Sequence, residues 1–152
     1  MASVKKYSIY EASDILHNAG TLHTSTVFLD YGTGEKFTST EVHTISYIVD
    51  NPGVSITQLA NDTGKTKGAI SQMVKKLVAK GLIRRMGSPV SDRMAQLYAT
   101  EAGMALHTAH KQYDTTSFGK GYKALCEMYS PEEVNAAWGI LDSWVKIRRQ
   151  MK

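Results

Sequence analysis

The segment that decides the fold is residues 55–100, SITQLANDTGKTKGAISQMVKKLVAKGLIRRMGSPVSDRMAQLYAT. Its first four residues, Ser55-Ile-Thr-Gln58, form a capping-box pattern and predict a short helix ending near residue 64. Thr66 can cap a second helix, which runs to residue 80 and has Gly81 placed to close it. In this second helix the apolar residues recur at the spacing of one buried face: Ile70, Met73, Val74 and Leu77. The segment therefore predicts two helices joined by a tight turn.

The chain on both sides of these helices continues the pattern. Residues 82–85 and 95–99 have the length and flanking turn residues of a two-stranded ribbon. Further helices are predicted over residues 9–29, 38–49, 101–128 and 130–151, with Gly119 and Gly121 expected to break the third of them. The fold class is therefore mainly α with a small β-ribbon.

Positive charge is concentrated in one part of the chain. Between Lys65 and Arg93 there are eight Lys or Arg and one acid, Asp92, for a net charge of +7. The other residues carry ten bases against thirteen acids, so the rest of the chain is close to neutral. One strongly basic motif on a nearly neutral body is typical of a nucleic-acid-binding protein, because neutralised phosphates release condensed counterions.

The exposed face of the predicted 66–80 helix has the side chains such binding needs. None of these residues is bulky enough to hold the helix out of a major groove, and the Lys, Ser and Gln side chains among them can hydrogen-bond base edges or phosphates. They are Lys67, Gly68, Ser71, Gln72, Lys75 and Lys76. An ordinary solvated helix face is the alternative, but the capped helix before it and the ribbon after it favour recognition.

Other classes of protein find little support in the sequence. Gly64-Lys65-Thr66 resembles the end of a phosphate-binding loop, but the required earlier glycine is replaced by Leu59. With no nucleophile signature either, we expect no enzyme. The chain has no apolar run of membrane-spanning length, no signal-peptide pattern and a single cysteine, Cys126. These features predict a cytoplasmic protein that does not engage membranes.

The chain resembles a known family, the MarR family of winged helix-turn-helix transcription regulators. The resemblance rests on ITQLANDTGKTKGAISQMVKKLVAKGLIRR, followed by SPVSDRMAQLYATEAGMAL, where Ser-Asp-Arg precedes a strand and a Thr-x-x-Gly helix start. It implies one MarR-like domain over 1–152, with a winged helix-turn-helix at 38–100. A helical dimerisation region at 9–30 and 101–152 is implied with it.

The resemblance also implies how DNA is contacted. Arg93 at the wing tip would enter the minor groove, with Asp92 holding its guanidinium. Two recognition helices in a homodimer would read a palindromic double-stranded operator. The predicted DNA-binding residues are Thr38, Ser39, Thr66, Lys67, Gly68, Ser71, Gln72, Lys75, Lys76, Asp92 and Arg93.

The terminal helix supports a homodimer on separate grounds. Apolar residues cover much of its circumference, which is broad for a helix at the end of a small domain. They are Ala136, Ala137, Trp138, Ile140, Leu141, Trp144, Val145 and Ile147. We therefore expect a partner subunit to cover this surface.

Two kinds of effector are compatible with the sequence. The family arrangement implies a small aromatic or phenolic effector in the cleft between the lobes, which Tyr10, Phe28, Tyr31, Tyr47 and Tyr113 would line. Some family members bind zinc, and the matched positions here are His23, His43, His110 and Asp114, a set that could form a tetrahedral site.

The sequence thus predicts a sequence-specific DNA-binding transcriptional regulator, in the leading interpretation a repressor controlled by an effector between the lobes. One alternative is a zinc-responsive member of the same family. Another is a ligand- or metal-binding interaction protein that does not bind an operator. A last alternative is a purely structural role, in which the aromatic residues pack in the core and the histidines form hydrogen bonds without binding an effector.

Overall fold

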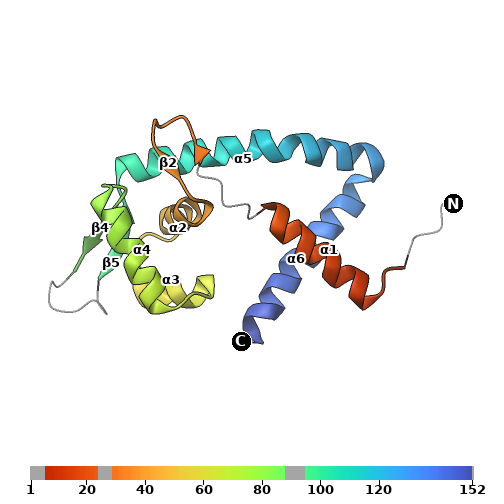
Figure 1. Cartoon of the computed structure of the whole chain (residues 1–152), viewed down its shortest axis with the longest axis horizontal. Helices are drawn as coiled ribbons and strands as arrows, with labels where there is room; N and C mark the ends of the chain where they lie inside the picture. Colours follow the sequence, from red (N-terminus) through yellow and green to blue (C-terminus); the bar gives the residue numbers. More distant parts are fainter. Residues whose placement is uncertain (1–5, 24–28, 88–94, 152) are drawn as a thin grey trace.

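The computed structural model describes residues 6–23, 29–87 and 95–151, and the side chains of 21–23 are not described. Helices dominate, as the sequence predicts, and Figure 1 shows a small lobe joined to an arm of long helices. The helices are α1 (Ile9–His23), α2 (Ser39–Asp50), α3 (Ile56–Thr63), α4 (Lys67–Ala79), α5 (Glu101–Met128) and α6 (Pro131–Gln150).

A three-stranded antiparallel sheet lies beside the helix pair. Its strands are β3 (Val54–Ser55), β4 (Ile83–Met86) and β5 (Gln96–Ala99), in the order β3-β5-β4. β4 and β5 are the predicted ribbon, with Ile83 opposite Ala99 and Met86 opposite Gln96. β3 was not predicted, because two residues are too few to show an alternating pattern.

The helix starts follow the capping residues that the sequence marks. Thr38 and Glu41 satisfy each other's backbone donors in a capping box, and Ser130 and Glu133 do the same at α6. The hydroxyl of Thr66 accepts a hydrogen bond from the backbone N–H of Ala69 (3.2 Å). Local capping chemistry therefore fixes where the helices of the lobe begin.

The core lies within the small lobe. The apolar faces of α2, α3 and α4 meet the sheet and the first turns of α5 there. Ile70, Val74 and Leu77, the predicted buried stripe of α4, are at most 1% exposed. Burying this stripe leaves the opposite side of α4 to face away from the lobe.

Two expectations about α1 and α5 need correction. α5 runs unbroken through Gly119 and Gly121, so the predicted break is wrong. A Cβ added at either glycine would meet nothing within 4 Å, and each glycine costs a helix only about 1 kcal/mol. α1 is described over Ile9–His23, and Leu29, the last residue of the predicted helix, lies in a β-strand instead.

A hairpin not predicted from the sequence connects α1 to α2. β1 (Leu29–Asp30) pairs antiparallel with β2 (Lys36–Phe37). Between them, Oδ1 of Asp30 accepts hydrogen bonds from the backbone N–H groups of Gly32, Thr33 and Gly34. Gly32 and Gly34 both have positive φ, which glycine adopts without steric cost.

The long helices carry large apolar side chains on their surface. α5 runs along one edge of the molecule, α6 turns back from its end, and α1 crosses α6 (Figure 1). Ile9 is 92% exposed and Ile140 is 68% exposed. Within the described residues, no helix is long and apolar enough to cross a membrane.

Candidate nucleic-acid interface

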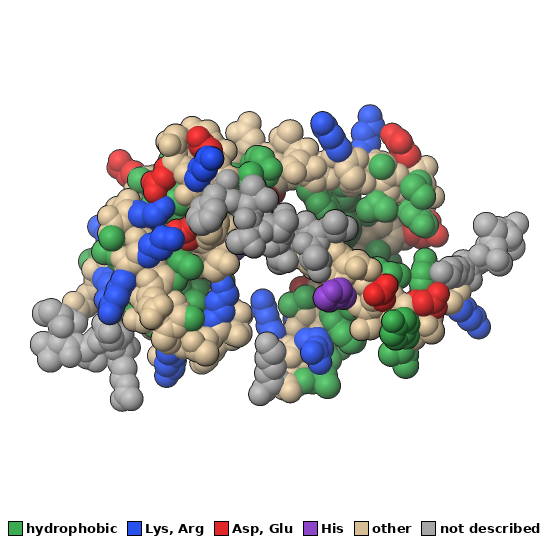
Figure 2. Space-filling view, viewed as in Figure 1, with side chains coloured by type: hydrophobic (Ala, Val, Ile, Leu, Met, Phe, Trp, Pro, Cys, Tyr) green, Lys and Arg blue, Asp and Glu red, His purple; other side chains and the backbone are tan. Residues whose placement is uncertain are grey.

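The outward face of α4 carries the predicted contact residues together. Lys67, Gly68, Gln72 and Lys75 are exposed, and Ser71 is half-buried beside them. Because α4 is capped at Thr66 and held through its apolar stripe, these side chains stand on a rigid support. Lys and Arg side chains lie across the lobe at the left of Figure 2.

The wing follows directly from α4. Gly81, at φ +70°, ends the helix and turns the chain into β4. The guanidinium of Arg84 lies 5.8 Å from the centroid of the Tyr98 ring across the ribbon. The predicted wing-tip residues Asp92 and Arg93 lie outside the described residues, so their groove contact stays a prediction.

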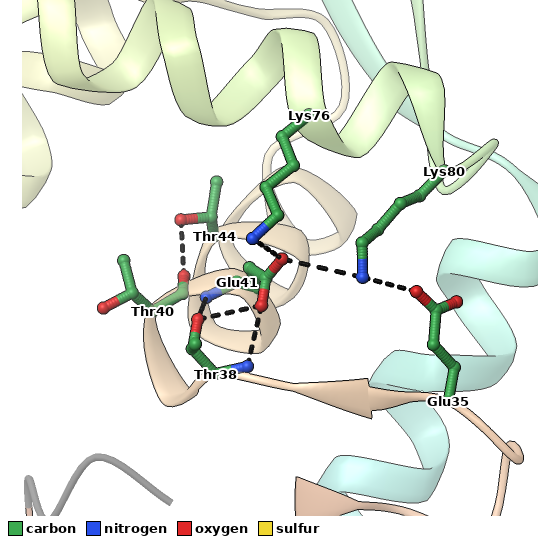
Figure 3. A network of polar contacts seen from close by, with 7 residues as sticks. All are labelled: Glu35, Thr38, Thr40, Glu41, Thr44, Lys76 and Lys80. Atoms are coloured by element: carbon green, nitrogen blue, oxygen red, sulfur yellow. Dashed lines mark hydrogen bonds and ion pairs between the residues drawn. The ribbon is translucent and has the colours of Figure 1, made fainter. Parts of the chain in front are cut away.

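The N-terminus of α2 is held by a network (Figure 3) in which the sequence predicts the Thr38–Glu41 capping box but not the lysines that join it. Oε2 of Glu41 accepts hydrogen bonds from the backbone N–H and the hydroxyl of Thr38, at 2.7 and 2.9 Å. Nζ of Lys76 lies 2.9 Å from Oε1 of Glu41, and Nζ of Lys80 lies 3.8 Å from it. Lys80 also pairs with Glu35 of the hairpin (2.5 Å). The network joins α2, α4 and the hairpin.

Two predicted contact residues take part in this network. The Thr38 hydroxyl serves the capping box, and Ser39 beside it is half-buried. The Lys76 ammonium is directed toward Glu41 rather than lying on the open face of α4 with Lys75. The structure therefore separates Lys76 from the other predicted DNA contacts.

The Glu41 side chain is buried, with only 1% of its surface exposed, beside the cationic Lys76. Burial by itself would raise its pKa. Hydrogen bonds from Thr38 and Lys76, together with the positive charge of Lys76, outweigh burial and lower the pKa below its ordinary value. A buried carboxylate with these partners stabilises the folded lobe mainly while it stays ionised.

Acidification is expected to remove this stabilisation. Because the folded-state pKa of Glu41 is lowered, its contribution is present above the ordinary pKa of about 4.5 and is lost as the pH falls through the folded-state value. Urea unfolding at a series of pH values should show wild type losing free energy of unfolding more steeply than Glu41→Gln, whose amide does not titrate. Parallel pH profiles would contradict this role.

A second cluster gathers several predicted effector and metal residues. The Tyr31 ring packs edge-on against His110 and Tyr113, with centroids 5.2 and 5.3 Å apart. The rings of His43 and His110 are 4.9 Å apart, and Nε2 of His110 lies 3.1 Å from Oδ2 of Asp114. Burial, then the nearby Asp114 and Tyr113, raises the pKa of Tyr31, which keeps its hydroxyl protonated.

The other predicted effector residues lie elsewhere. The Tyr47 hydroxyl donates a hydrogen bond to Asp62 (2.5 Å), which ties α2 to α3, and this bond raises its pKa. Tyr10 is 81% exposed on α1. Phe28 lies outside the described residues. An open cleft between the lobe and α6 is lined instead by cations and an aromatic residue, including Lys65, Trp144, Arg148 and Arg149.

The predicted zinc set is only partly brought together. His43, His110 and Asp114 are neighbours, whereas the side chain of His23 is not described. Among the described side chains, no group of three or more His, Cys, Asp or Glu could hold a metal ion. The described part of the cluster therefore does not by itself form the tetrahedral site.

The site and the fold define a class of protein. A capped helix pair, a second helix with an exposed basic face and a β-ribbon wing make this a winged helix-turn-helix protein. The MarR family model matches residues 36–93, the part of the chain that holds the helix pair and the start of the wing, so this part is similar to the MarR family. This confirms the resemblance recognised in the sequence.

The relatives support the same fold. The chain is 29% identical over 108 residues to the uncharacterized HTH-type transcriptional regulator YhjH of Bacillus subtilis (strain 168). That match covers 70% of this chain and 60% of the relative's length.

Solved structures match over most of the chain. Streptococcus pneumoniae FabT in complex with DNA is 22% identical, with a TM-score of 0.67 over 93% of this chain and 94% of its own. The zinc-responsive MarR family member ZitR of Lactococcus lactis is 16% identical, with a TM-score of 0.61 over 91% and 98% of the two chains. At identities of 22% and 16%, these matches show a shared fold and nothing more specific.

Proposed function

We propose that this protein is a sequence-specific, double-stranded DNA-binding transcriptional regulator that acts as a homodimer. The observation that carries the proposal is the face of α4, where Lys67, Gln72 and Lys75 stand exposed on a helix fixed by its buried stripe. Two relatives with this fold are described in complex with DNA, FabT and ZitR. The basic charge of residues 65–93 supports the same function.

The exposed apolar surfaces of the long helices support the homodimer. Leu141, Trp144, Val145 and Ile147 are 36–51% exposed on α6. A single protomer in water would expose this surface, so a second copy covering it is favourable. Two recognition helices about 34 Å apart would then meet successive major grooves of a palindromic operator.

We place control of binding at the cluster formed by Tyr31, His43, His110 and Tyr113, where the hairpin, α2 and α5 meet. A small aromatic or phenolic effector there would favour one spacing of the two lobes and so release or strengthen operator binding. Zinc is the alternative effector. Metal-free protein whose stability ignores added zinc would exclude that alternative.

Gln72→Ala and Arg93→Ala are each expected to weaken operator binding while leaving the dimer intact. Gln72 stands on the exposed α4 face, where a bidentate contact to adenine is worth about 1–3 kcal/mol, so a loss of roughly tenfold or more is expected. Selection from random DNA first supplies the operator, and titrations at one fixed salt concentration then compare the variants.

Gln112→Ala is the matched control, because this glutamine is exposed on α5 away from α4. It should bind the operator like wild type. Unchanged affinity of both Gln72→Ala and Arg93→Ala would overturn the assignment. Failure of the selection to enrich any palindrome would favour a ligand-binding interaction protein without an operator.

A further inference from the structure

The lysines of the basic segment fall into two groups by where their charges lie. Lys65, Lys67 and Lys75 are exposed, and no ion pair is formed by them within the described residues. Lys76 and Lys80 instead extend from α4 toward the N-terminus of α2 (Figure 3). The sequence does not distinguish these groups, because their partners lie 35 to 45 residues away along the chain.

Glu41 is the centre of the second group. Its Oε2 is taken by the two hydrogen bonds from Thr38, so its Oε1 is the atom left to face α4. Nζ of Lys76 occupies that side at 2.9 Å. A carboxylate that is 1% exposed cannot replace this partner with bulk water, so the pair resists being opened by a competing phosphate.

Lys80 is held still more completely. Its side chain is 21% exposed, its Nζ pairs with Glu35, and the same Nζ lies 4.4 Å from the centroid of the Phe37 ring. Lys80 therefore remains engaged even where Glu41 is neutral. Lys76, with a side chain that is 52% exposed, forms no other ion pair within the described part of the chain.

We propose that Glu41 is a positioning residue for DNA recognition, which withholds Lys76 from the phosphates and fixes the face that α4 presents. The inference rests on the proposed DNA-binding function. The ion pair between Lys76 and Glu41 ties α4 to the first turn of α2. The exposed face of α4 therefore keeps a fixed orientation relative to the rest of the lobe. Withholding a charge also lowers the sequence-independent part of binding, which favours discrimination between operator and other DNA.

The test is the salt dependence of binding to operator and to random-sequence duplex. Each neutralised phosphate adds about 0.9 to the slope of log affinity against log salt concentration. Glu41→Gln removes the charge but keeps a residue suited to the capping box, so it frees one lysine per subunit. The dimer slope should steepen by about 2, a further loss of about tenfold in affinity between about 50 and about 200 mM salt.

Lys76→Gln tests the same contact by changing the lysine, and its expected result is an unchanged salt slope. Its amide can still donate a hydrogen bond to Glu41, and because this lysine is withheld the slope should stay at the wild-type value. The double variant Glu41→Gln/Lys76→Gln should return to that value as well. A slope that flattens by about 2 in Lys76→Gln would show that Lys76 already contacts phosphate and would overturn the proposal.

Lys75→Gln separates this inference from the function on which it rests. Lys75 is the exposed neighbour, so its loss should flatten the slope by about 2 per dimer. No DNA binding by wild type, or no effect of Lys75→Gln, would contradict the proposed α4 interface itself. If Glu41→Gln fails to fold, as thermal unfolding would reveal, the slope of Lys76→Gln decides the proposal alone.

Discussion

Ile140→Asp is expected to convert the proposed homodimer into monomers and to remove most of the operator affinity. Ile140 is 68% exposed in the protomer, on the same side of α6 as Trp144. A carboxylate there would have to lose its hydration inside the subunit interface, which is unfavourable without a partner. A monomer has one recognition helix, and losing the linked second site costs about 10²–10⁴ in affinity.

Light scattering after size exclusion measures the first effect, and titration with the operator measures the second. Asn135→Asp introduces the same carboxylate on α6 at an exposed position on the polar side of the helix, where Asp142 and Lys146 lie. This control should remain dimeric. An Ile140→Asp protein that stays dimeric would refute the interface, and a monomer with full affinity would refute the two-half-site mechanism.

Features set by neighbouring residues could be predicted from the sequence. The capping boxes at Thr38 and Ser130 depend on partners three residues away, and the buried stripe of α4 depends on helical periodicity. The α3–α4 helix pair and the β4–β5 ribbon confirm the winged helix-turn-helix that these signals predict. Such contacts are visible in sequence because their spacing is fixed by the helix itself.

Features set by tertiary contacts could not be predicted. The pairing of Lys80 with Glu35 joins residues 45 apart, and nothing in either local pattern marks the partner. Lys76 has the spacing of an exposed contact residue, yet Glu41 draws its ammonium toward α2.

The β1–β2 hairpin, in contrast, could have been predicted from Asp30 and the glycines at positions 32 and 34, because Asp side chains commonly accept backbone hydrogen bonds in turns.

Gly103→Ala is expected to destabilise the lobe by about 1–3 kcal/mol, the usual cost of forcing extra volume into a packed site. Gly103 lies in the first turn of α5, where an added Cβ would meet the carbonyl oxygen of Leu82 at 2.1 Å. That oxygen accepts the backbone N–H of Thr100 (3.0 Å), and the Thr100 hydroxyl donates to the carbonyl of Gly81 (2.6 Å). The carbonyl cannot turn away without losing these contacts, so the start of α5 must move off the sheet.

Urea unfolding at one fixed protein concentration measures the change, because a homodimer's apparent stability depends on protomer concentration. The midpoint should fall while the slope of free energy against denaturant stays the same. Gly68→Ala is the matched control, since a Cβ there meets nothing within 4 Å and alanine favours helix. Its free energy of unfolding should not fall. Equal stability of Gly103→Ala and wild type would show that α5 can shift on the sheet at no cost. The close contact between Gly103 and Leu82 would then not fix the position of α5 relative to the wing.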